Sequence, residues 1–365
     1  MQTKIFLPNN HSKWQIAYRE VTPEISKEIA GVFLKHYGEE GDVVVSVEQV
    51  DEAEINSNNF KVTFVRRGVE HTMLVRRYGE KRDKDLLEAT AAVLDHLGAK
   101  GVRVPKILRS HAGNTFEREG AYTHTAFEFL DAQHYRGTLP EISATATELA
   151  KLHAALGDLP NKTALEQAVA FPEATLHLRT YDQDIWNRIL TAAKANDSSR
   201  NDPEFDAHLL ESESLIRDAV RDTPPDAYAH REQSLVHFDL HPHNILTDGS
   251  DLRAIIDLDS LRKLEPMRAT AFALHRLVRQ HVVHTEPEDL EEAIRKAIKV
   301  FLNAYTGVTR LTDEELASIP YFIRNEALSR LSYAMKDYYF NNNPAWKGDL
   351  DKQTATIAEA KYFEL

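Results

Sequence analysis

The stretch of sequence that decides the fold is Leu235–Ser260, LVHFDLHPHNILTDGSDLRAIIDLDS. Two short apolar runs flank a loop crowded with histidine, aspartate and asparagine, a combination that a packed core seldom needs. Pro242 makes the loop irregular, and a turn at Asp248-Gly249 leads to a further strand that ends at Asp257. We therefore expect strand, loop, strand, turn and strand, with acidic side chains at the strand ends.

The polar residues of this stretch suit phosphoryl transfer, which needs a carboxylate near the attacking hydroxyl and oxygen ligands for magnesium. Asp239 can be that carboxylate, and the Asn244 amide and the Asp257 carboxylate are hard ligands for magnesium. Asp259 would point to the same side as Asp257 and could bind metal too, but Asp257 directly follows the apolar run and is preferred. His237 is expected to be structural.

A zinc site is the alternative for the same loop, because His237, His241 and His243 could gather a metal together with Asp239. Their spacings match no common zinc pattern, and magnesium explains the acids better. Taken alone, His237 is equally well a satisfied, partly buried histidine.

The residues before this loop have a strand-rich pattern with one helix. Alternating apolar runs predict strands at Val43–Gln49, Phe60–Arg66, Thr72–Arg77 and Tyr122–Leu130. Arg67-Gly68 predicts a tight turn, and an apolar stripe predicts a helix over Asp85–Leu97 that stops at Gly98.

The second half of the chain is mainly helical in its periodicity. Two capping boxes predict helix starts: Thr285 with Glu288, and Thr312 with Glu315. We predict an α+β, two-lobed chain, with a strand-rich lobe over residues 1–130, a helical lobe over 131–365, and a short hinge near Asp131–Leu139.

The motif His237-x-Asp239-x-x-x-x-Asn244, followed by Ile256-Asp257, resembles the signature of the aminoglycoside phosphotransferase and choline kinase family. The resemblance spans roughly residues 43 to 280 and implies a bilobal protein-kinase-like fold. It also implies ATP and Mg²⁺ as cofactors, Asp239 as catalytic base, and a small-molecule hydroxyl acceptor such as an aminoglycoside, a sugar or an amino alcohol.

The resemblance further implies a nucleotide site in the first lobe. Arg76 stands where many relatives have a lysine that grips the nucleotide phosphates, and Glu88 would pair with it. Arginine can bind phosphate bidentately, but its planar fork is larger than an ammonium group. Without the resemblance, Arg76 and Glu88 are equally well surface charges.

Two other segments are similar to the family's nucleotide-binding elements. A glycine-rich loop is missing, so Ser57 and Asn58 could cover the phosphates, although an ordinary hairpin turn fits as well. Glu128 and Leu130 lie in a stretch that resembles the segment whose backbone meets adenine, and a buried edge strand would look the same.

Composition limits the partners. The chain of 365 residues has 44 Lys plus Arg against 57 Asp plus Glu, and its net charge of −13 argues against general affinity for nucleic acid or anionic membrane. The acidic balance would suit a cationic or neutral polar acceptor, although solubility is the commoner explanation. The absence of cysteine excludes disulfides and thiolate chemistry, and the absence of long apolar runs makes a cytoplasmic location the default.

Two competing interpretations remain. The unusual loop and Arg76 would also suit a catalytically weak, nucleotide-binding pseudokinase. A protein kinase is disfavoured, since Phe238 stands where that class has an arginine. Acceptor contacts are expected from the helical half, with acidic stretches at Glu286–Glu292 and Asp313–Glu315 as candidates. Aromatic candidates there are Tyr333, Tyr338, Tyr339 and Trp346.

Overall fold

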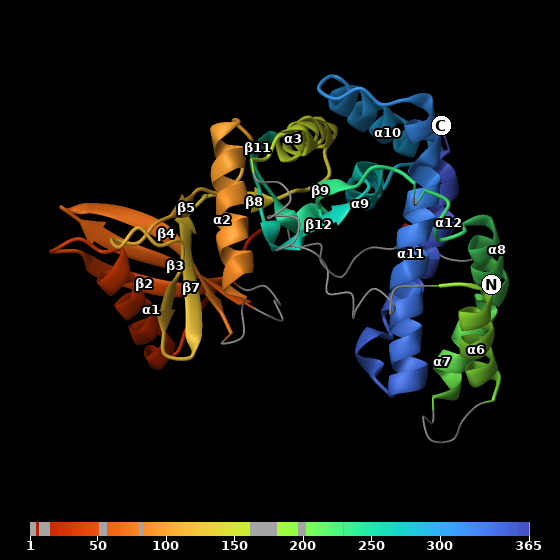
Figure 1. Cartoon of the computed structure of the whole chain (residues 1–365), viewed down its shortest axis with the longest axis horizontal. Coiled ribbons are helices and arrows are strands. Elements are labelled where there is room, and N and C mark those ends of the chain that lie inside the picture. The colour runs from red at the N-terminus through yellow and green to blue at the C-terminus, as the bar shows by residue number, and fades with distance from the viewer. Residues whose placement is uncertain are drawn as a thin grey trace.

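The computed structural model describes residues 5–6, 15–50, 57–79, 83–160, 181–195, 202–228 and 230–364. Figure 1 shows a strand-rich part at one end of the molecule and a mainly helical part at the other, with α2 (Lys84–Ala99) standing between them. This arrangement confirms the predicted α+β, two-lobed fold. The lobe limits at residues 130 and 131 stay a prediction.

The strand-rich part is built on one antiparallel sheet with the order β1-β2-β3-β4-β7-β5, and β6 pairs with β7. Its strands are β1 (Tyr18–Glu20), β2 (Val43–Val50), β3 (Ser57–Arg66), β4 (Val69–Tyr78), β5 (Ile107–Leu108), β6 (Glu117–Glu119) and β7 (Tyr122–Glu128). All four predicted strands are present, with ends that differ by a few residues. Arg67 and Gly68 both have positive φ, as the predicted tight turn between β3 and β4 requires.

Helices cover the two faces of this sheet differently. The first helix, α1 (Pro23–His36), buries Ile29 and Phe33 against Phe60 and Val75 of the sheet. The predicted helix over Asp85–Leu97 is α2, and its Thr90 and Leu94 border a cleft on the other face. Residues on β3 and β4 therefore alternate between the α1 core and the cleft.

The helical part contains α3 (Leu139–Gly157), α6 (Gln183–Lys194), α7 (Pro203–Glu211), α8 (Glu213–Asp222), α9 (Pro266–Thr285), α10 (Leu290–Thr306), α11 (Asp313–Asn341) and α12 (Asp349–Glu359). Short 3₁₀ turns lie at η1 (Pro242–Asn244), η2 (Leu258–Ser260), η3 (Pro344–Trp346) and η4 (Ala360–Phe363). Among the described helices, none combines the length and hydropathy that a membrane span requires.

One of the two predicted capping boxes is confirmed and the other is wrong. Thr312 and Glu315 form a complete box at the start of α11. Thr285 instead ends α9, where its hydroxyl donates to the carbonyl of His281, and Asp289 caps α10. A proline at position 287 keeps residue 286 out of a new helix, so the start moves downstream to the next capping side chain.

The predicted strand, loop and turn around Leu235–Ser260 form two small sheets between the lobes. They contain β8 (Gln133–His134), β9 (Ser234–His237), β10 (Ile245–Asp248), β11 (Asp251–Ile255) and β12 (Leu261–Leu264). β10 pairs with β11 and β8, and β12 pairs with β9. Gly137 passes so close to α9 that a Cβ atom there would lie 2.9 Å from the backbone of Gln280, which fixes the start of α3 against α9.

Candidate functional site

A cleft of about 830 Å³ separates the sheet from the small β10–β11 hairpin. Its sheet wall carries Asn59, Leu74 and Arg76, and its other wall carries Leu246 and the segment 256–259. Phe127–Leu130 closes one side. The walls are mostly apolar with a few charged groups at one end, which is the pattern of a site for a flat ring attached to a polar group.

His237 holds the loop at the charged end of this cleft. Its Nε2 lies 2.9 Å from the carbonyl oxygen of Ile256, so Nε2 carries the proton, and Nδ1 accepts from the backbone amide of Asp239 at 3.3 Å. The Ser260 hydroxyl lies 3.1 Å from the same Nδ1 and donates to the carbonyl of Asp257. Burial lowers the pKa of His237, which keeps it neutral. This network agrees with the expected structural role.

Asn244 joins the loop to the following strand. Its Nδ2 donates to the carbonyl oxygen of Asp239 at 2.9 Å, and its own carbonyl accepts from the amide of Ile256 at 2.9 Å. The side-chain oxygen Oδ1 therefore faces away from the Asp239 carbonyl and accepts no hydrogen bond from any described residue. Such an amide oxygen can coordinate a hard cation.

Asp257 occupies a strained position at the end of the same segment. Its backbone lies in the left-handed region with φ of 63°, which aspartate tolerates better than most residues. Its Oδ1 accepts from Nη1 of Arg76 at 3.2 Å, and Asp259 Oδ2 lies 3.5 Å from the same nitrogen. A strained residue that directs a carboxylate into a cleft is typical of functional sites.

Two side chains, Arg330 and His241, lie beside the Asp239 carboxylate. Nη2 of Arg330 lies 3.4 Å from Oδ1, and Nε2 of His241 lies 3.5 Å from Oδ2. Burial alone would raise the pKa of Asp239, but the hydrogen bond with His241 and the positive charge of Arg330 hold it far below its usual range. The carboxylate is therefore ionised. About 37% of the side chain is exposed, so it is also accessible.

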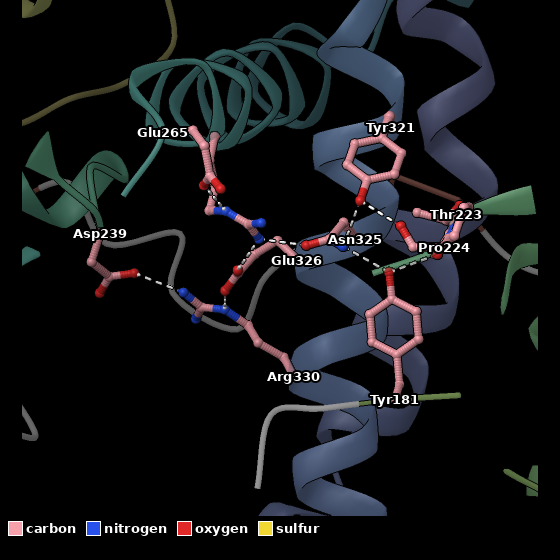
Figure 2. Close-up of polar contacts among 10 residues, drawn as sticks. Tyr181, Thr223, Pro224, Asp239, Glu265, Tyr321, Asn325, Glu326 and Arg330 are labelled. Carbon is pink, nitrogen blue, oxygen red and sulfur yellow. Dashed lines mark hydrogen bonds and ion pairs between the residues drawn. The ribbon is translucent and has the colours of Figure 1, made fainter. Parts of the chain in front are cut away.

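A buried polar network holds Arg330 from behind, and Figure 2 shows it running across α11 and α9. Glu326 accepts from Nε of Arg330 at 2.6 Å and also faces Arg268, which donates to Glu265 at 2.9 Å. Asn325 continues the network. Its Nδ2 donates to the hydroxyls of Tyr181 at 2.7 Å and Tyr321 at 3.2 Å, and these hydroxyls donate to the carbonyls of Thr223 and Pro224.

The predicted pair of Arg76 with Glu88 is wrong. Glu88 lies on the outer face of α2, where Lys84 is its partner at 3.5 Å and more than half of its side chain is exposed. Two residues further on, Thr90 borders the cleft. Positions two apart on a helix differ by about 200°, so Glu88 points away from Arg76. Arg76 instead contacts Asn59, whose Oδ1 accepts from Nε of Arg76 at 2.8 Å.

The other predicted nucleotide-binding residues are placed as follows. Ser57 and Asn58 begin β3; the Ser57 side chain and the loop before it lie outside the described residues. Asn58 Oδ1 accepts from Gln49 Nε2 at 2.7 Å, while its neighbour Asn59 borders the cleft. An Asn58 side-chain contact with a cleft ligand therefore loses support. Both Glu128 and Leu130 border the cleft.

The segment Phe127–Leu130, called the connecting segment below, has some backbone groups that are hydrogen-bonded and some that are not. The Glu128 amide donates to the Lys106 carbonyl at 2.9 Å, and its carboxylate accepts from the Lys106 amide at 2.8 Å. The Leu130 backbone forms no hydrogen bond with any described residue. An open donor and acceptor beside an apolar slot suit a heterocyclic ring. Adenine binding by Glu128 and Leu130 stays a prediction.

The zinc alternative loses its support. Both ring nitrogens of His237 are engaged in hydrogen bonds, and the described part of the chain contains no group of three His, Cys, Asp or Glu side chains that could hold a metal ion. The oxygen atoms of Asn244 and Asp257 remain as the ligands with the right chemistry for a hard cation.

Arg276, Arg330 and Glu326 were not predicted from the sequence. They lie on α9 and α11, and both helices carry several other charged and amide side chains, so no local pattern distinguishes these three. The acidic stretches expected to contact an acceptor instead begin α10 and α11, where negative charge stabilises the helix ends.

Comparisons with known proteins bear on the family of this chain. A family model described as "Phosphotransferase enzyme family" matches residues 47–297, more than half of the chain. The homoserine kinase of Zymomonas mobilis subsp. mobilis is 24% identical over 243 residues, which is 65% of this chain and 66% of that protein, just under two thirds of its length. The homoserine kinase of Rhodopseudomonas palustris is 25% identical over 312 residues, covering 84% of this chain and 83% of its own.

The fold also occurs in solved structures. A spectinomycin phosphotransferase in complex with ADP and spectinomycin superposes with a TM-score of 0.61 at 12% identity, covering 93% of this chain and 98% of its own. That solved structure therefore shares the fold of this chain. This chain belongs to the phosphotransferase enzyme family, which confirms the resemblance and the prediction of an enzyme.

Proposed function

We propose that this phosphotransferase moves the γ-phosphate of ATP to a hydroxyl of a small polar molecule, with Mg²⁺ as the required ion. The observation that carries the proposal is the ionised, accessible Asp239 carboxylate on a loop that hydrogen-bonds directly to the wall of the cleft. The connecting segment with Glu128 and Leu130 would take the adenine ring, and Arg76 the phosphates.

Asp239 would accept a hydrogen bond from the acceptor hydroxyl and orient its oxygen toward the γ-phosphorus. The new bond joins that oxygen to phosphorus, the bond between the β–γ bridging oxygen and phosphorus breaks, ADP leaves, and the hydroxyl proton passes to the Asp239 carboxylate. A carboxylate with a strongly lowered pKa is a weak base, so most of its effect would come from positioning.

The residues present fit a magnesium ion. Asn244 contributes an amide oxygen without another partner among the described residues, and Asp257 contributes a carboxylate that is about one-third exposed. When bound, the ion would neutralise charge on the phosphates. Asp259 is the additional candidate, because it shares the Arg76 guanidinium with Asp257.

The acceptor class follows from the relatives. Both relatives named above are homoserine kinases, whose acceptor carries a primary hydroxyl on a short chain, and we propose a hydroxylated metabolite of that size for this enzyme. The expected cytoplasmic location remains a part of this proposal, as does the expectation that nucleic acid is no substrate.

The test is ADP release by the purified protein across a panel of hydroxylated metabolites and antibiotics, with Asp239→Asn as the decisive variant. We expect at least one acceptor to stimulate ADP release, and the variant to reduce kcat about 10²- to 10⁴-fold with the KM for ATP nearly unchanged. Asp248→Asn, in the exposed hairpin turn, is the matched control. Equal turnover by Asp239→Asn and the native protein would refute the assignment.

A further inference from the structure

Arg276 is a buried cation without a carboxylate partner. Only 8% of the residue is exposed, and its guanidinium forms neither an ion pair nor a hydrogen bond with any described residue. Its guanidinium lies over the face of Phe272, whose ring centre is 5.1 Å away. Burial lowers the pKa of Arg276 to about 10, so it still carries its charge at neutral pH.

Such a residue is costly to the folded state. A buried charge without a partner loses hydration that no ion pair replaces. The neighbouring Arg279 illustrates the usual solution, because it is paired with the buried Glu359, which also accepts from His275 at 2.7 Å. Arg276 is thus ready to receive an anion from outside the chain.

The place of Arg276 in the fold identifies where that anion would lie. The guanidinium of Arg330 lies 4.9 Å from the centre of the same Phe272 ring, and Phe272 contacts Phe238, the residue before Asp239. Electrostatic interactions couple Arg276 with both Arg330 and Asp239. The cation is therefore linked, through Phe272 and Arg330, to the carboxylate that would meet the acceptor hydroxyl.

A third helix adds another cation to this region. Lys352 of α12 is exposed, yet the surrounding protein and the positive charge of Arg276 lower its pKa to about 8. Electrostatic interactions also couple Lys352 with Arg330, Asp349 and Asp239. Neither Arg276 nor Lys352 forms an ion pair with any described residue.

We propose that Arg276, assisted by Arg330, binds a carboxylate on the acceptor and makes hydroxy acids, including hydroxylated amino acids, the preferred acceptor class. This inference rests on the proposed function and narrows it. It contrasts with the cationic acceptor that the net charge of −13 would suit, because Arg276 is a buried cation with no ion-pair partner among the described residues. Two guanidiniums around one carboxylate supply several charge-assisted hydrogen bonds.

Three acceptors separate the carboxylate from the rest of the molecule. L-homoserine has a hydroxyl, an amine and a carboxylate; 3-aminopropan-1-ol is the same chain without the carboxylate; 4-hydroxybutyrate is the same chain without the amine. We expect kcat/KM for L-homoserine to exceed that for 3-aminopropan-1-ol by about 100-fold or more, since a site built for a charged group rejects an analogue that lacks it.

The decisive variant is Arg276→Gln, with Arg295→Gln on the exposed face of α10 as the charge-matched control. Arg276→Gln should raise the KM for L-homoserine about 10- to 100-fold, leave turnover of 3-aminopropan-1-ol within about threefold, and leave the KM for ATP unchanged. An equal loss of kcat/KM with L-homoserine and with 3-aminopropan-1-ol would overturn the inference. A rise in the KM for ATP instead would assign Arg276 to the nucleotide phosphates and overturn it as well.

A binding measurement separates this inference from the proposed function. Calorimetric titration with L-homoserine and 4-hydroxybutyrate should give weaker binding to Arg276→Gln than to the native chain, whether or not phosphate is transferred. Absence of turnover with every acceptor, together with arginine-dependent binding, would reject the proposed kinase activity alone. Equal affinities in the two proteins would reject the carboxylate site, and circular dichroism verifies that the variant is folded.

Discussion

The guanidinium of Arg76 on β4 lies 3.2 Å from the carboxylate of Asp257, a residue 181 positions further along the chain. This contact joins the sheet to the loop segment across the cleft. Its other neighbours, Asn59 and Asp259, give the guanidinium a fixed orientation. A cation held in this way can receive nucleotide phosphates after small side-chain movements.

Replacement of Arg76 tests whether this cation binds nucleotide. Arg76→Lys keeps the charge but loses the planar fork that reaches Asn59, so we expect the KM for ATP to rise by no more than about tenfold. Arg76→Met removes the charge and should raise it about 100-fold. Steady-state kinetics measures both variants. If Arg76→Met keeps the native KM for ATP, the residue serves only to join the two lobes.

Asp257→Asn tests the proposed metal ligand. The substitution keeps the size of the side chain and its left-handed backbone but removes the negative charge. We expect activity to stop on chelation and to return with Mg²⁺, and the variant to need about tenfold or more Mg²⁺ for half-maximal activity. The control is Asp251→Asn at the exposed end of the hairpin. An unchanged magnesium requirement in Asp257→Asn would argue against this ligand.

The loop was predictable from the sequence because its chemistry is local. Asp239 and Asn244 directly precede the β10–β11 hairpin and Asp257 directly follows it, so a hairpin between them can bring the three side chains to one end. It was harder to predict which face of α2 lies toward the cleft. The resemblance of this stretch to the family's helix suggested Glu88, but the neighbouring apolar residues of α2 turn Thr90 toward the cleft instead.

The proposed acceptor side was not predictable, because its residues come from three helices that meet only in the folded chain. Arg330 reaches Asp239 from 91 positions away, and Arg276 and Lys352 come from α9 and α12. Side-chain spacing within each helix contains no information on which other helix it will face. Only packing brings these charges together.

Histidine burial predicts a loss of stability at acidic pH. His153 on α3 lies 2.8 Å from the Tyr305 hydroxyl, its Nε2 is buried without a partner among the described residues, and burial lowers its pKa to about 3. An unfolded histidine has a pKa of about 6.5. The folded state therefore binds fewer protons, so stability is complete above about pH 6.5 and falls below it.

The expected size is about 1.4 kcal/mol per pH unit from this residue, or about 2 kcal/mol at pH 5. Urea denaturation at pH 7 and pH 5 measures it, and His153→Gln should remove that share of the slope while the other buried histidines keep theirs. His111→Gln, at an exposed position, is the matched control. A slope unchanged by His153→Gln would exclude this histidine as a source.

Glu326→Gln tests whether the buried network positions Arg330. Glu326 is 5% exposed and accepts from Arg330 at 2.6 Å, so loss of its charge leaves two arginines competing for fewer acceptors. We expect the free energy of unfolding to fall by about 2 kcal/mol. Freed from Glu326, Arg330 should bind Asp239 more closely and lower kcat, with the KM for ATP unchanged. Glu314→Gln, on an exposed turn of the same helix, should stay within about 0.5 kcal/mol of the native chain. A destabilised Glu326→Gln with native kcat would show that the network serves stability alone.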